Sequence, residues 1–239
     1  MGYSTVNELK DLIKTSKNIV FFGGAGVSTE SGIPDFRSTD GLYNLQYRYP
    51  PEVILSHGFF WKNPREFYRF YFDKMIYTDK KPNACHLKLA KWESEGLLSA
   101  VITQNIDGLH YLAGSENVFE LHGSVHRNYC TRCGKFHSLQ QILKFAPDVP
   151  YCSCGGIIKP DVVLYEENLD DTTIKKSIAH IRSCDLLIVG GTSLKVYPAA
   201  GLIGYTNAPI VIINKSDTQY DGYAKMLINQ PIGEVFNLL

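Results

Sequence analysis

The chain has 239 residues, of which 44% are hydrophobic and 20% are charged, and this composition excludes a fibrous or a disordered protein. Its 24 lysine and arginine residues equal its 24 aspartate and glutamate residues in number, and such a balance argues against nucleic-acid and anionic-membrane partners. The longest apolar stretch, residues 19–27, is about half as long as a membrane-spanning helix. Because the first residues also lack a signal-peptide pattern, we expect a cytoplasmic protein. A monomer is expected as well.

The N-terminal segment predicts a helix followed by a buried strand. Residues 5–17 place apolar side chains on one helical face, and Thr5 and Glu8 have the spacing of a capping box. Residues 18–22 then form an apolar run that ends in the glycine turn 23–26. A glycine turn between a strand and a helix lets a phosphate group approach backbone N–H groups. Thr29 stands where an ordinary dinucleotide fingerprint has its third glycine, so an ordinary dehydrogenase is not expected.

Further helices and strands follow in alternation. Asn63-Pro64 and Asn83 are expected to begin helices that reach about Tyr77 and Glu95. The runs 98–103, 185–189 and 208–213 are apolar without alternation, which is typical of strands buried on both faces. Strands separated by helices predict an α/β fold, a Rossmann-like doubly wound parallel sheet with a ligand crevice at the carboxyl ends of its strands.

Polar residues stand directly behind two of these predicted strands. Gln104, Asn105 and Asp107 follow the run 98–103, and buried polar side chains are costly there unless they meet a partner or a ligand. Helix capping by Asn105 or Asp107 is the structural alternative. His122 follows a short strand at 118–119, and its side chain has a pKa suited to proton transfer near neutral pH.

Four cysteines indicate a metal site. Cys130 and Cys133 are separated from Cys152 and Cys154 by eighteen residues, close to the spacing of a zinc ribbon. The second pair is one residue shorter than usual, but residues i and i+2 of an extended chain project to the same side. His137 or His126 would be the substitute ligand if Cys152 failed. Four protein ligands leave no open position, so the zinc is expected to be structural.

The motifs together, in their order along the chain, resemble the sirtuin family of NAD-dependent protein lysine deacylases. The matching segments are 24–28, 32–37, 103–107, 121–123, the paired cysteines, 159–163 and 190–193. The resemblance implies a Rossmann-like part at about residues 1–35, 85–125 and 160–239, a helical and cofactor-loop insertion at 36–84, and a small inserted zinc-binding module at 126–159. It implies NAD and one structural zinc ion as cofactors, and acyl-lysine proteins or peptides as partners.

The resemblance also implies the roles of individual residues. His122 would be the general base, with Asn105 and Asp107 as the other catalytic residues. The NAD-binding residues would be Gly24, Ala25, Gly26, Thr29, Asp35, Phe36, Arg37, Gln104, Asn105, Ile106, Asp107, His122, Thr192, Ser193 and Asn214. The acyl group would pass from lysine to ADP-ribose as nicotinamide leaves.

Substrate docking is a further implication of the resemblance. The peptide would add as a strand between the loop after Val163 and the loop 195–197. Residues 164–167 depart from the family's usual Phe-Gly-Glu turn. Tyr71 occupies the place of the arginine that family members selective for succinyl or malonyl lysine carry, and Arg69 lies on another helical face. Acetyl-lysine or an uncharged longer acyl chain is therefore expected to be preferred.

Two other functions remain open on the sequence alone. A protein mono-ADP-ribosyltransferase could use the same NAD pocket but would leave ADP-ribose on its target. A non-enzymatic NAD sensor or zinc-ribbon binding module would bind its ligand without turnover. The polar loop 104–107 and His122 argue against the second of these.

Overall fold

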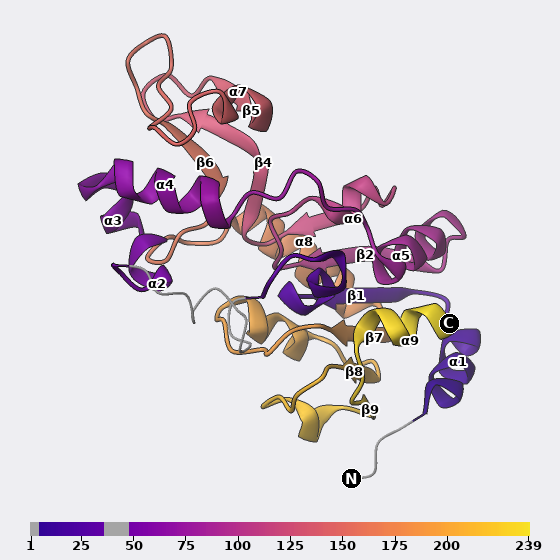
Figure 1. Ribbon diagram of the computed structural model, residues 1–239. Coiled ribbons are helices and arrows are strands. Elements are labelled where there is room, and N and C mark those ends of the chain that lie inside the picture. The colour runs from indigo at the N-terminus through magenta and orange to yellow at the C-terminus, as the bar shows by residue number, and fades with distance from the viewer. Residues whose placement is uncertain (1–4, 36–47) are drawn as a thin grey trace.

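The larger of two lobes is built on a six-stranded sheet in which every neighbouring pair of strands is parallel (Figure 1). The computed structural model describes residues 5–35 and 48–239. The strand order is β3-β2-β1-β7-β8-β9. The strands are β1 (Ile19–Gly23), β2 (Leu98–Thr103), β3 (Val118–Glu120), β7 (Leu186–Gly190), β8 (Ile210–Ile213) and β9 (Met226–Ile228).

Helices cover both faces of this sheet, which explains why its central strands are apolar throughout. One face carries α1 (Val6–Thr15), α5 (Ala84–Ser94) and α9 (Ile232–Leu238), and the other carries α8 (Asp171–Ser183) and the 3₁₀ helix Ala199–Tyr205. Successive residues of β1 point to opposite faces, so Phe21 packs with the first layer and Phe22 with the second. The doubly wound sheet predicted from the sequence is confirmed.

The predicted helix starts are confirmed at the caps, whereas the ends fall earlier than predicted. Thr5 and Glu8 form a capping box at α1, and the Asn63 side chain accepts the N–H of Glu66 at the start of α4 (Pro64–Lys74). Asn83 caps α5 in the same way. Helix α4 ends three residues before the predicted position, because side-chain capping marks a start more sharply than periodicity marks an end.

The smaller lobe combines a three-stranded antiparallel sheet with a helical segment. The sheet contains β4 (Gly123–Cys130), β5 (Phe136–Ser138) and β6 (Ile158–Val162) in the order β5-β4-β6. The helix α7 (Leu139–Leu143) follows β5 directly in the chain and contacts β4 and β5. The helices α2 (Pro51–Ile54), α3 (His57–Lys62) and α4 pack beside it. Their shared core is strongly aromatic and includes Phe60, Phe67, Tyr68, Phe70 and Tyr71. Neither this sheet nor β9 was predicted as strands.

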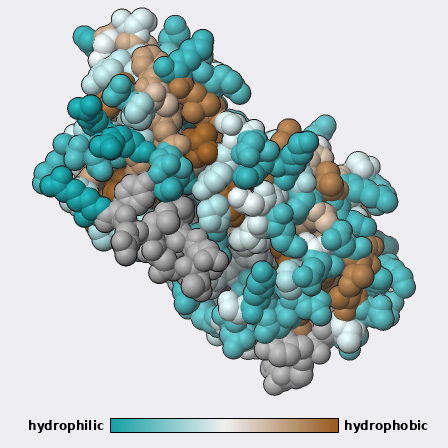
Figure 2. Space-filling view, in the orientation of Figure 1, coloured by the Kyte–Doolittle hydropathy of each residue, from teal (hydrophilic) through white to brown (hydrophobic). Residues whose placement is uncertain are grey.

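The face of the molecule in Figure 2 is mostly hydrophilic, with hydrophobic residues gathered over part of the upper lobe. None of the helices in the part of the chain that the structure describes is both long enough and apolar enough to cross a membrane. The short helix α6 (Leu109–Leu112) completes the large lobe and begins directly behind the polar loop 104–107.

Candidate active site and zinc centre

Two glycine turns meet where the strand order of the large sheet reverses. The chain moves outward from β1 through β2 to β3 on one side, and from β7 through β8 to β9 on the other, so the switch point lies between β1 and β7. The Gly26 N–H donates to the Gly191 carbonyl at 2.8 Å. A Cβ on Gly26 would lie 2.8 Å from the Gly191 Cα, and Gly191 itself has φ +58°. Glycine is therefore required for the contact, at the place where doubly wound sheets bind their ligands.

A buried polar cluster joins the first turn to the loop after β2. The Ser28 hydroxyl donates to Oδ2 of Asp107 at 2.7 Å and accepts the Asn105 side-chain amide at 3.0 Å. Ser28 and Asn105 are both buried. Burial raises the pKa of Asp107, against the lowering effect of its hydrogen bonds from the Leu109 N–H and Ser28. The N-cap residue of α6 is Gly108, so neither Asn105 nor Asp107 occupies the predicted capping position. The Asp107 carboxylate nevertheless accepts the N–H of Leu109, the first residue of that helix, in addition to its bond within the cluster.

Gln104 links the same loop to the turn after β7. Its side-chain amide donates to the Thr192 hydroxyl at 3.0 Å, and its backbone N–H donates to the Gly23 carbonyl at 3.0 Å. Three strand ends are therefore tied together at the switch point. Ile106 points the other way and packs against the core of the small lobe, while its carbonyl accepts the Val125 N–H at 3.0 Å.

His122 lies in the turn between β3 and β4. Its Nδ1 is 2.9 Å from the Gln104 carbonyl oxygen. Because a carbonyl only accepts, Nδ1 carries the proton and the lone pair of the neutral ring is on Nε2. Burial lowers the pKa of His122, and the hydrogen bond to Gln104 partly offsets this effect. The histidine is therefore held neutral, in the tautomer of a base that acts through Nε2.

An ion-pair network stands two residues before His122. The side chain of Glu120 is 4% exposed and pairs with the Arg127 guanidinium at 2.6 Å, and Asp161 of β6 pairs with the same guanidinium at 2.7 Å. Burial raises the pKa of Glu120, and the hydrogen bond and charge of Arg127 oppose that shift. The network ties the end of the large sheet to two strands of the small one.

The four cysteines predicted as zinc ligands converge on one point. All four sulfur atoms of Cys130, Cys133, Cys152 and Cys154 lie within 4.8 Å of one another. Cys130 and Cys154 are 3.4 Å apart, and Cys133 and Cys152 are 3.8 Å apart. A tetrahedral zinc–thiolate centre with bonds of about 2.3 Å needs sulfur separations of about 3.8 Å. The donor set fits zinc, and the short Cys152-x-Cys154 pair is no obstacle.

The histidines named as substitute ligands have other roles. After the Cys154 N–H, the neighbouring His137 contributes to the lowering of the Cys152 pKa to about 7. Nε2 of His126 instead lies 3.0 Å from the Asp107 carbonyl oxygen, beside the polar cluster.

The predicted NAD contacts of residues 24–29 lie in and just after the turn that follows β1. Gly24, Ala25 and Gly26 form the turn after β1, and the Thr29 hydroxyl donates to the Gly26 carbonyl at 3.0 Å. Asp35 closes the first described stretch, whereas Phe36 and Arg37 lie outside the described residues.

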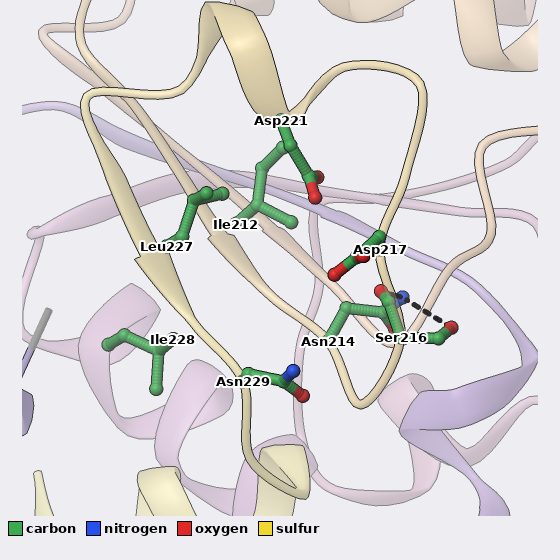
Figure 3. Close-up of a pocket in the computed structure, with 8 residues that line it drawn as sticks. All are labelled: Ile212, Asn214, Ser216, Asp217, Asp221, Leu227, Ile228 and Asn229. Carbon is green, nitrogen blue, oxygen red and sulfur yellow. Dashed lines mark hydrogen bonds between the residues drawn. The ribbon is translucent and has the colours of Figure 1, made fainter. Parts of the chain in front are cut away.

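The predicted adenosine-side residues follow two adjacent strands. Thr192 and Ser193 come after β7, and Asn214 comes after β8. Figure 3 shows a hollow beyond β8 and β9, lined by Ile212, Asn214, Ser216, Asp217, Asp221, Leu227, Ile228 and Asn229. The Asn214 side chain donates to the Ser216 carbonyl at 2.8 Å, which fixes its position at the edge of the hollow.

Three members of the site were missed from the sequence. Ser28 ends the matching segment 24–28 but was assigned no role from the sequence, although it joins Asn105 and Asp107. A serine directly behind a glycine turn, with three polar residues behind the next strand, is the signal that could have found it. No sequence pattern points to Glu120 and Arg127. Their ion pair forms only because the folded chain brings Arg127 of β4 next to the end of β3.

Comparison with known proteins agrees with this arrangement. The model of the family described as Sir2 matches residues 24–198. An NAD-dependent protein deacetylase of Clostridium acetobutylicum is 58% identical over 234 residues, 96% of each chain. Another, from Cutibacterium acnes, is 49% identical over 98% of this chain and 96% of that protein.

Solved structures give the same result. A Sir2 complex with a p53 peptide and NAD⁺ has a TM-score of 0.89 at 39% identity, and Sir2 bound to an acetylated peptide has 0.88 at 37%. Both alignments cover 98% of this chain and 97% of the other. From its motifs, its fold and these relatives, the chain belongs to the Sir2 family.

Proposed function

We propose that this protein is an NAD-dependent protein-lysine deacetylase that transfers the acyl group to ADP-ribose and releases nicotinamide. The observation that carries the proposal is the polar cluster at the switch point, with His122 fixed beside it in the tautomer of a base. Relatives named NAD-dependent protein deacetylase at 49–58% identity support it.

The residues at the switch point fit NAD. Two glycine turns come together at the carboxyl ends of β1 and β7, where doubly wound sheets bind nucleotides, and the polar side chains of Gln104, Asn105 and Asp107 lie beside them. NAD bound there supplies an activated ribose carbon and nicotinamide as the leaving group. The Gly24–Thr29 turn would hold its phosphates, and Thr192, Ser193 and Asn214 its adenosine end.

His122 would take a proton from a ribose hydroxyl at Nε2. Its Nδ1–H is fixed on the Gln104 carbonyl, so the imidazolium formed would keep that hydrogen bond. Asn105 would order the ribose, and Asp107 with the Ile106 backbone would hold the nicotinamide carboxamide. Ser28 would keep Asn105 and Asp107 in place through its hydrogen bonds to both side chains.

The zinc would be structural. Cys130, Cys133, Cys152 and Cys154 use all four tetrahedral positions, so no position is left for water or substrate. The bound ion would join β4 to the loop before β6 and so support the small lobe.

Nicotinamide release from NAD, measured with and without an acetyl-lysine peptide, tests the proposal. A deacetylase releases nicotinamide in proportion to deacetylated peptide. Mass spectrometry of the reacted protein and peptide separates the alternative, because a mono-ADP-ribosyltransferase leaves ADP-ribose on its target. Binding of NAD without peptide-dependent turnover would favour a sensor and overturn the proposal.

A further inference from the structure

Two residues other than glycine have a positive φ in the described part of the chain. They are Glu166 at +75° and Leu194 at +52°. Side chains with a Cβ are strained in this region of backbone space, and such strain collects at functional sites. Under the proposed function, both residues lie in the loops that flank the incoming acyl-lysine peptide.

The strained conformation of Glu166 is held by a bond to a neighbouring segment. Its Oε2 accepts the Gly58 N–H, in the first turn of α3, at 2.9 Å. On either side of this bond, the Tyr165 N–H donates to the Leu55 carbonyl and the Tyr165 carbonyl accepts the His57 N–H, both at 2.9 Å. A Cβ on Gly58 would lie 3.2 Å from Oε2 of Glu166, so the small residue leaves room for the carboxylate.

Glu167 fixes the other end of the same turn. Its Oε2 accepts the Leu164 N–H at 2.9 Å and the Lys159 ammonium at 3.0 Å, and its Oε1 is 2.8 Å from Nδ1 of His57. These hydrogen bonds and charges outweigh burial and lower the pKa of Glu167. The two carboxylates thus bind the loop 163–167 to the α2–α3 turn from both sides.

A glutamate at position 166 differs from a glycine both in backbone strain and in side-chain bonding. The family's usual turn has glycine at this place, and glycine takes a positive φ without strain. Glu166 adopts a positive φ despite its Cβ, and its carboxylate accepts a charge-assisted hydrogen bond, which a glycine has no side chain to form. A glutamate at this position therefore accepts backbone strain, and its side-chain hydrogen bond fixes the position of the loop.

We propose that Glu166 and Glu167 form an acidic clip that positions the peptide-docking edge of this enzyme before substrate arrives. Both are positioning residues, acting through the loop 163–167. A docking edge that is already ordered loses less conformational entropy when an extended peptide pairs with it, so the peptide binds more tightly. The inference rests on the proposed function and adds to it the residues that set peptide affinity.

The test is the kinetics of Glu166→Gly and Glu166→Gln. In Glu166→Gly the clip is lost while the strain is relieved, so we expect the KM for an acetyl-lysine peptide to rise by about fivefold or more. The melting temperature and the KM for NAD should stay close to those of the wild type, which a merely structural role would not predict. Glu166→Gln keeps an oxygen that accepts the Gly58 N–H and should restore most of the peptide affinity.

Glu52→Gln, an exposed carboxylate on nearby α2, serves as the charge control and should leave all constants unchanged. Gly58→Ala changes the other partner of this hydrogen bond and should also raise the peptide KM, because the added Cβ crowds the Glu166 carboxylate. An active wild type with an unchanged peptide KM in Glu166→Gly overturns the clip alone. A wild type that does not deacetylate the peptide overturns the proposed function and the clip together.

Discussion

At the scale of single residues, the site depends on how burial and one hydrogen bond act on His122. The Gln104 carbonyl selects the tautomer, and the surrounding protein disfavours the imidazolium. A histidine prepared in this way is a base before any ligand binds. Because this carbonyl belongs to the loop that carries Asn105 and Asp107, the hydrogen bond fixes the position of His122 relative to the polar cluster.

Replacement of His122 should separate chemistry from binding. We expect His122→Ala to lower kcat for deacetylation by about 100-fold or more, the scale of a positioned acid or base. NAD binding, followed by calorimetry, should persist. His180→Ala on α8 is the matched control and should retain full activity. If the His122 variant turned over acetyl-peptide at the wild-type rate, the base would be another group.

The pH profile gives an independent check on the same residue. A base is active above its pKa and loses activity as pH falls through it. Since burial lowers the pKa of His122, the acid limb of kcat/KM should lie below the ordinary histidine value of about 6.5. A limb at higher pH would contradict the assignment, provided that the protein is shown to remain folded over the range by circular dichroism.

The acyl preference that the resemblance implies would depend on the side chains of α4. Tyr71 is fully buried and stacked on Phe67 at 5.6 Å between ring centroids, and Tyr68 donates to the Ile158 carbonyl. Arg69 is exposed and pairs with Glu66, as its predicted position on another face requires. No cation is therefore available on the buried face of this helix to pair with a succinyl carboxylate.

We expect kcat/KM for an acetyl peptide to exceed that for the succinyl version of the same peptide by about 100-fold or more, because a carboxylate would enter an aromatic surrounding unpaired. A propionyl peptide should behave like the acetyl one. Equal turnover of the succinyl peptide would refute this assignment. Tyr71→Arg is a poor gain-of-function variant, since it would place a guanidinium in a filled aromatic core.

At the scale of elements, the strands of the large sheet could be predicted from the sequence far better than those of the small sheet. The strands β1, β2, β7 and β8 are apolar on both faces and therefore stand out, whereas β9 has three residues and too short a pattern. The strands of the small lobe alternate or include proline, as Lys159-Pro160-Asp161 does in β6. Their pairing follows from the metal-ligand turns and distant contacts, which local pattern does not encode.

The same distinction applies to the site. Residues in contiguous motifs, such as Gln104, Asn105 and the cysteines, could be found by position alone. The bond from Glu166 to Gly58 spans more than 100 positions, and only the fold brings these residues together.

Zinc removal should affect the small lobe first. We expect a strong chelator to release one zinc ion per chain and lower the melting temperature, because a structural zinc contributes its binding free energy to folding. Cys133→Ser should mimic the loss. Cys184→Ser, at a buried cysteine far from the cluster, is the control for thiol replacement. A metal-free protein with full activity and unchanged melting would contradict the site.

At the scale of the whole molecule, the turn that carries His122 connects the two sheets. The end of β3 carries buried Glu120, the start of β4 follows His122 directly, and Arg127 with Asp161 completes the connection. The two sheets therefore meet at the residue that would perform the chemistry. A change in their contact should affect stability and catalysis together.

Arg127→Ala is the variant that tests this connection. It leaves the Glu120 carboxylate buried without its cation, and we expect a loss of about 3 kcal/mol in the free energy of unfolding, measured in urea. Asp161→Ala should cost less than about 1 kcal/mol, because the Asp161 side chain is 41% exposed and its ion pair is partly screened by solvent. The double variant Glu120→Gln with Arg127→Ala should be more stable than Arg127→Ala alone, since it removes the unpaired charge. Equal losses for Arg127→Ala and Asp161→Ala would show that burial of Glu120 does not govern the contact between the sheets.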